Sequence, residues 1–99
     1  MAAIPYPKAP TPYGSFTWLD ISAATVVKAT SGVVVNVNVI TAGTTVGTVN
    51  DVATTGGAAV TNQVASLPNT VGSYRVGMPC ATGIVIVPGS GQVVAVSFD

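Results

Sequence analysis

The side chains that most often carry catalysis are scarce in this chain of 99 residues. It has no histidine, and its only acidic residues, Asp20, Asp51 and Asp99, lie far apart in the sequence. General acid–base catalysis usually relies on histidine or on a carboxyl group with a shifted pKa. The single cysteine, Cys80, has no histidine to activate it and stands among apolar residues, which favours a buried structural role over a nucleophile. We therefore expect no enzyme activity.

Metal and phosphate sites are equally poorly supported. One cysteine without histidine makes no zinc cluster. The pair Asn50-Asp51 offers too few carboxylates for a calcium site, so a bulge or turn is the favoured interpretation there. The glycine-rich residues 55–57 and 89–91 lack the lysine and the helix of a phosphate-binding loop, and they are interpreted as turns. No cofactor or metal is expected.

Charge is nearly absent from this sequence. Charged residues make up 6% of the chain and the formal net charge is zero, against about 25% charged residues in an ordinary domain. Three scattered cations cannot build a footprint for nucleic acid or hold an anionic membrane surface. Little charge repulsion favours association with other subunits. The alternative is a monomer kept soluble by threonine, serine, asparagine and glycine. Arg75, the only arginine, is either an interface anchor or a solvated strand residue.

Residues 1–16 differ from the rest of the chain because proline recurs through them. Proline fixes φ and holds the preceding residue extended, which predicts a polyproline-like N-terminal arm. The arm either lies on a neighbouring subunit or is a frayed terminus. Trp18, just after it, is either a core or rim aromatic or an interface anchor. The candidate interface residues are Pro5, Tyr6, Pro7, Pro10, Pro12, Tyr13 and Trp18.

Residues 17–99 have the pattern of a single β domain. Short valine- and threonine-rich segments alternate with glycine, proline and asparagine at a spacing of roughly 8–12 residues, which is typical of a sandwich or barrel. The clearest segment is 33–41, where alternation predicts one apolar face made by Val33, Val35, Val37 and Val39. About eight strands are expected, at residues 16–21, 24–29, 33–41, 45–53, 58–66, 71–78, 84–87 and 92–98. The fold class is therefore an all-β, small antiparallel β-sandwich, either jelly-roll or immunoglobulin-like.

Three segments resemble small virion structural proteins of tailed bacteriophages. They are Thr41-Ala42-Gly43-Thr44-Thr45-Val46-Gly47-Thr48-Val49-Asn50-Asp51, then Ala65-Ser66-Leu67-Pro68 with Gly72-Ser73-Tyr74, and then Cys80-Ala81-Thr82-Gly83-Ile84-Val85-Ile86-Val87. The resemblance extends over residues 32–98 and leaves out the arm. It implies a β-sandwich structural protein of the head decoration (cement) type, or of the neck or tail. It brings no catalytic residues.

Two functions follow as expectations. The first is a capsid decoration protein that binds and stabilises a shell of major capsid protein, or other virion subunits, as a small homo-oligomer with a trimer favoured. Such a protein is assembled in the host cytoplasm and located in the virion, and it binds neither nucleic acid nor membrane. The alternative is a neck-, tail- or fibre-associated adhesion module that binds a host surface glycan. The start of the chain has no basic, apolar signal-like segment, so no secretory signal is expected.

Overall fold

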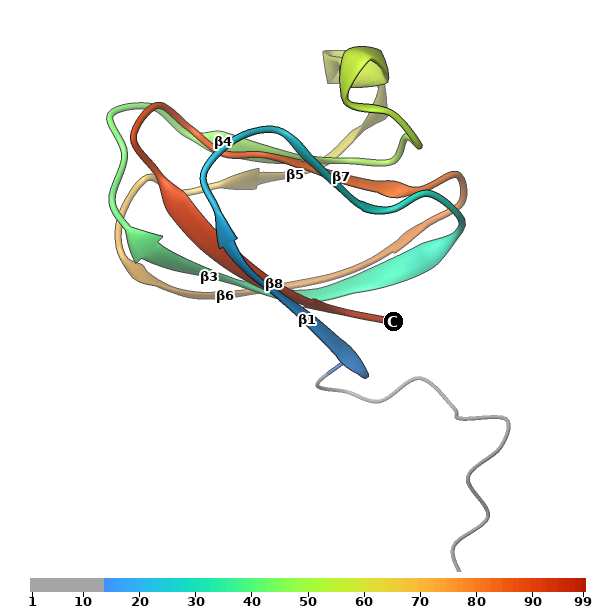
Figure 1. Cartoon of the computed structure of the whole chain (residues 1–99), viewed down its shortest axis with the longest axis horizontal. Coiled ribbons are helices and arrows are strands. Elements are labelled where there is room, and N and C mark those ends of the chain that lie inside the picture. The colour runs from blue at the N-terminus through green and yellow to red at the C-terminus, as the bar shows by residue number, and fades with distance from the viewer. Residues whose placement is uncertain (1–13) are drawn as a thin grey trace, which may run out of the picture.

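The computed structural model describes residues 14–99, which form two four-stranded antiparallel sheets stacked as a sandwich (Figure 1). The first sheet has the strand order β1-β8-β3-β6 and the second has the order β2-β7-β4-β5. This confirms the all-β sandwich with eight strands. The strands are β1 (Phe16–Ile21), β2 (Thr25–Lys28), β3 (Gly32–Thr41), β4 (Gly47–Asn50), β5 (Gln63–Leu67), β6 (Gly72–Cys80), β7 (Ile84–Val87) and β8 (Val93–Phe98).

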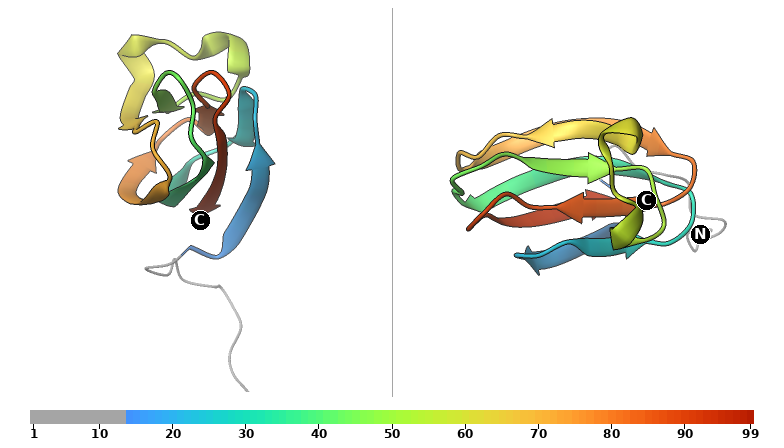
Figure 2. Two further views of the ribbon diagram at one scale, coloured as in Figure 1. Left: turned by 90° about the vertical axis from the view of Figure 1, so that its left-hand side faces the viewer. Right: turned by 90° about the horizontal axis from the view of Figure 1, so that it is seen from above.

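The strand pairs nest inside one another along the chain. β4 pairs with β5, β3 with β6, β2 with β7 and β1 with β8, all antiparallel. The chain therefore resembles one long hairpin whose tip lies between β4 and β5. The additional pairs β3–β8 and β4–β7 join the nested pairs into the two sheets. Figure 2 shows the layers from two further directions.

The strand register shows that the connections between strands lie at two opposite ends of the sandwich. Phe16 pairs with Phe98 and Gly32 with Cys80, so β1 and β3 begin where β8 and β6 end. We call this the entry end, because the described chain enters there at Gly14, and it also holds the β2–β3, β4–β5 and β6–β7 connections. The opposite end, the loop end, holds the other four connections. Both chain termini of the described domain thus lie at the entry end (Figure 1).

Valine and isoleucine side chains fill the space between the sheets. β-branched residues suit a pleated strand and pack with little loss of rotamer freedom. Val94, Val96 and Phe98 of β8 are buried inward as the alternation predicted. Both faces of β7 are covered, since Ile84, Val85 and Ile86 are all buried. The core residues are Ile21, Val27, Val34, Val37, Val39, Val49, Leu67, Cys80, Ile84, Ile86, Val94, Val96 and Phe98.

The predicted face of β3 is wrong at its first two residues. A register shift between Val34 and Asn36, seen against both β6 and β8, interrupts the alternation. Because of this bulge Val34, together with Val37 and Val39, joins the core, whereas Val33 and Val35 do not. An extra residue in a strand moves the following side chains to the other face. Strict alternation over the whole run therefore misplaced the start of the strand.

The strand predicted at 58–66 is also shorter than expected. Its first half contains a 3₁₀ turn at Val60–Asn62, and β5 begins only at Gln63. The turn predicted at residues 55–57 is confirmed as a 3₁₀ turn at Thr55–Gly57. Buried Asn50 holds this connection, because its Nδ2 donates to the Ala59 carbonyl and to the Asn62 Oδ1. Asn62 Oδ1 also accepts from the Ala59 N–H. These amide contacts satisfy local backbone groups and compete with a longer strand.

Candidate interface at the entry end

Large apolar side chains are exposed on both edge strands of the first sheet, toward the entry end. Residues paired across an antiparallel sheet share a face, and the register builds two neighbouring rows on the inner face. The row nearest Gly14 contains Phe16, Phe98, Val34 and Met78, and the next contains Trp18, Val96, Val37 and Tyr74. The middle of each row is buried, but Phe16 is 58%, Trp18 43% and Met78 39% exposed.

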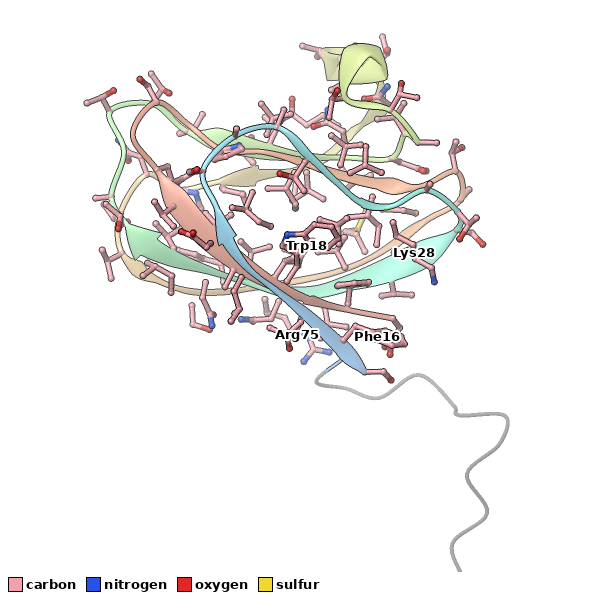
Figure 3. The ribbon with its side chains drawn as sticks, in the orientation of Figure 1. Phe16, Trp18, Lys28 and Arg75 are labelled. Atoms are coloured by element: carbon pink, nitrogen blue, oxygen red, sulfur yellow. The ribbon has the colours of Figure 1, made fainter. Side chains whose placement is uncertain are left out.

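Trp18 is the one predicted interface residue that lies within the described part of the chain. Its side chain points from β1 into the space between the layers, while Arg75 lies on the outer side of the same sheet (Figure 3). Phe16 packs on Phe98, with ring centroids 5.6 Å apart. Trp18 is therefore a half-exposed rim aromatic beside a second exposed ring. The predicted residues Pro5, Tyr6, Pro7, Pro10, Pro12 and Tyr13 lie outside residues 14–99.

Charged side chains lie on three of the four edge strands. Asp20 lies on β1, Lys28 on β2 and Arg75 on β6. Asp20 also has a φ of 56° at an irregularity of β1, and Gly77 has a φ of 63° in β6, where Pro79 follows. Charges, bulges and prolines on edge strands oppose edge-to-edge pairing with another chain. The few charges of this domain thus lie where they oppose pairing of its sheet edges with another chain.

A hollow opens at the entry end between the start of β3 and the end of β6. Residues 31–33, residues 79–81 and Asp51 line this entry hollow, which has a volume of about 460 Å³. The Asp51 carboxylate holds the β6–β7 connection beside it: Oδ1 accepts from the N–H groups of Thr82 at 2.7 Å and Gly83 at 3.2 Å, and Oδ2 accepts from that of Ala81 at 3.0 Å. The walls are mainly apolar, and Asp51 is the one charged side chain among them.

No family model, curated protein or solved structure matches this chain. The function must therefore be inferred from the residues themselves. Within residues 14–99 no cluster of three or more histidine, cysteine, aspartate or glutamate side chains is placed to hold a metal ion. The same part of the chain contains no helix long and apolar enough to cross a membrane.

Sequence reasoning singled out Trp18, whose contact role stays a prediction, and did not anticipate the exposure of Phe16 and Met78 or the contacts of Asp51. The exposure of Phe16 and Met78 depends on β1 and β6 being sheet edges, which alternation within a strand does not reveal. The pair Asn50-Asp51 was interpreted as a bulge or turn, and the register does shift between Val49 and Asn50. The contact between Asp51 and the β6–β7 connection joins residues about thirty positions apart, which no local pattern signals.

Acidification should weaken the β6–β7 connection through Asp51. Hydrogen bonds from the N–H groups of Thr82 and then Ala81 hold the pKa of Asp51 below its ordinary value of 3.8. A folded-state pKa below the unfolded one gives stability above pH 3.8 that is lost as the pH falls through the lowered value. An Asp51→Asn variant should be less stable than wild type at neutral pH, because its amide N–H₂ opposes a backbone N–H.

The difference between wild type and Asp51→Asn should then shrink as the pH falls through this lowered pKa, where the wild-type carboxylate is also lost. Urea unfolding midpoints of both proteins at a series of pH values measure this difference. A difference that stays constant or grows as the pH falls would show that the carboxylate charge is not what fixes the connection.

The Cys80 thiol should be inert in the native protein. Burial, with a further contribution from the negative charge of Asp51, raises the pKa of Cys80 to about 11, and the residue is 2% exposed. Relative to an ordinary thiol, the thiolate fraction at pH 8 then falls by roughly a hundredfold. Labelling by a disulfide reagent should be at least that much slower in buffer than in denaturant. Equal rates in both conditions would contradict the burial of Cys80.

Proposed function

We propose that this chain is a capsid decoration protein that binds a shell of major capsid protein or other virion subunits. The observation that carries the proposal is the exposure of Phe16 and Trp18 on the same face of β1, with Met78 exposed at the opposite edge of the same sheet, at the end where residues 1–13 join the domain. A nearly uncharged domain with its edges protected, and with aromatic side chains at one end, is suited to being held by neighbouring subunits.

The nested strand order supports a jelly roll rather than an immunoglobulin-like sandwich. A jelly roll has eight strands in two sheets and two Greek keys, and the order β1-β8-β3-β6 with β2-β7-β4-β5 fits that description. Jelly rolls occur in viral capsid and lectin domains. Fold alone does not decide function, so the surface at the entry end carries the proposal and the fold agrees with it.

The energy available at this surface suits a protein used in many copies. An aromatic side chain presents about 150–250 Å² of area. Covering the exposed parts of Phe16 and Trp18 therefore stabilises a contact by about 2 kcal/mol each, before ordering costs. Such contacts are weak singly but add up over a lattice or a ring of subunits. Because charge contributes little, binding should depend only weakly on salt.

The test of the virion role is to locate the protein on particles. An antibody raised against the purified chain should label the heads of virions of the phage that encodes it, in many copies and equally at about 0.1 M and 1 M salt. Labelling confined to tails, release from the heads in moderate salt, or absence from the virion would overturn the decoration role.

The exposed Trp18 also supports a second candidate, an adhesion module that binds a glycan. Tryptophan offers a flat apolar face with one N–H donor at its edge, which suits stacking on a sugar ring. Titration of tryptophan fluorescence with a panel of bacterial surface glycans separates the two functions, because Trp18 is the only tryptophan. A saturable change with one glycan class would favour adhesion, and no change would favour decoration.

Phe16 provides a prediction for association itself. A Phe16→Ser change should weaken self-association about tenfold or more, because it removes an aromatic ring from the contact. Val46→Ser is the matched control: Val46 is nearly equally exposed but lies in the β3–β4 connection at the loop end. Sedimentation at several concentrations gives both constants. Equal weakening by the two changes would show that the entry end is not the contact surface.

A further inference from the structure

We propose that the entry hollow receives residues 1–13 of a second copy of this chain. This inference rests on the proposed function only in assuming that copies associate through the entry end. It adds the acceptor site on the domain and the segment that fills it. Three features support it: the chemistry of the hollow, the chemistry of residues 1–13, and the direction in which the chain enters the domain.

The hollow and the segment are complementary in charge and polarity. Val33, Pro79 and Cys80 give the hollow apolar walls, and Asp51 is its charged group. Residues 1–13 contain four prolines, two tyrosines and an isoleucine, and their one charged side chain is that of Lys8. A carboxylate has about four acceptor positions. Three at Asp51 are taken by backbone N–H groups, which leaves one for an ammonium group.

The entry direction favours a second copy over the same chain. The Ser15 N–H donates to the Phe98 carbonyl at 3.0 Å and to the Asp99 Oδ1 at 2.9 Å, so the chain at this point still runs alongside the end of β8. A continuation in this direction leaves the domain at its β1 side. The β6 wall of the hollow lies three strand spacings away, about 14 Å across the sheet.

To reach its own hollow, the chain would have to cross the end of β8, which lies between β1 and the β3 wall of the hollow. A polyproline segment of thirteen residues spans about 40 Å. That length is enough to bridge to a neighbouring domain. A segment passed from each copy to the next gives a small ring when the rotation between copies closes.

Disulfide trapping in the full-length chain tests the proposal. Ala9→Cys places a thiol beside Lys8, and Ser31→Cys places one in the exposed rim of the hollow. The matched control pairs Ala9→Cys with Ser90→Cys, an exposed serine at the loop end. Cys80 stays in place in both, since it is buried. A docked segment has an effective concentration near millimolar, so at about 10 µM protein the pair at Ser31 should cross-link roughly a hundredfold faster than the control.

The products distinguish the outcomes on a non-reducing gel. Covalent dimers and closed rings are expected from Ala9→Cys with Ser31→Cys, and adding Lys8→Glu should slow their formation about twofold to fivefold. A monomer with an internal disulfide would show that the segment docks on its own domain, and equal rates for Ser31 and Ser90 would show that it does not use the hollow. Either result overturns the inference. If the mass in solution still shows an oligomer, the proposed function survives that result.

Discussion

Replacing Gly89 by alanine is expected to lower the free energy of unfolding by about 3 kcal/mol or more. A Cβ on Gly89 would overlap the backbone carbonyl of Thr45 in the β3–β4 connection. Neither side can yield easily. Thr45 Oγ1 accepts from the Ser90 N–H at 2.8 Å, and the Thr44 N–H donates to the Ser90 carbonyl at 2.9 Å. A methyl group there must separate two connections that the hydrogen bonds hold together.

Gly56→Ala is the control for this change. No atom lies within 4 Å of the place where a Cβ on Gly56 would stand. Alanine there should leave stability unchanged or raise it by about 0.4–1 kcal/mol by restricting the unfolded chain. The urea concentration at half-unfolding measures the stability of both variants, provided that the dependence of the unfolding free energy on urea keeps the same slope. A Gly89→Ala protein as stable as wild type would mean that the two connections at the loop end can move apart freely.

Replacing Gln92 by leucine should have a comparable effect for a different reason. Gln92 is 0% exposed, and its side chain joins two connections: Oε1 accepts from the Gly89 N–H at 2.9 Å and Nε2 donates to the Pro68 carbonyl at 2.9 Å. Leucine keeps most of the volume but leaves both backbone groups unpaired. An unsatisfied buried group costs about 1–3 kcal/mol, so a loss of about 2–5 kcal/mol is expected in total.

Gln63→Leu is the matched control for Gln92. The Gln63 amide donates to the Ser66 hydroxyl at 2.9 Å in an exposed contact within β5, where water can replace it. The expected change is within about 0.5 kcal/mol. Denaturant unfolding of the two variants gives the comparison. Similar losses of stability for the two variants would show that the buried hydrogen bonds of the Gln92 amide contribute no more than the exposed one of Gln63.

Much of the fold could be predicted from the sequence because it depends on local alternation. Val94, Val96 and Phe98 alternate and lie inward, and the doubly apolar segment Ile84–Val87 is covered on both faces. The errors arose where the backbone departs from alternation. The bulge between Val34 and Asn36 left Val33 and Val35 outside the core, and side-chain amides turned residues 60–62 into a 3₁₀ turn. Both depend on partners distant in sequence.

Less of the candidate interface could be predicted, because exposure is decided by sheet order. Trp18 was identified by its type and by its position after the proline-rich segment. Phe16 and Met78 form the two ends of a single row only because β1 and β6 are the outer strands of one sheet. Asp20, Lys28 and Arg75 were seen as scattered charges, and their common position on edge strands became visible only in the folded chain.

The mass of the full chain in solution tests most directly whether this domain is built to be held by neighbours. Sedimentation equilibrium from micromolar to millimolar concentration should give a small multiple of the 9.8 kDa chain mass. The multiple should be the same at about 0.1 M and 1 M sodium chloride, because the contact surface is apolar and nearly uncharged. A 9.8 kDa species at every concentration would contradict the account.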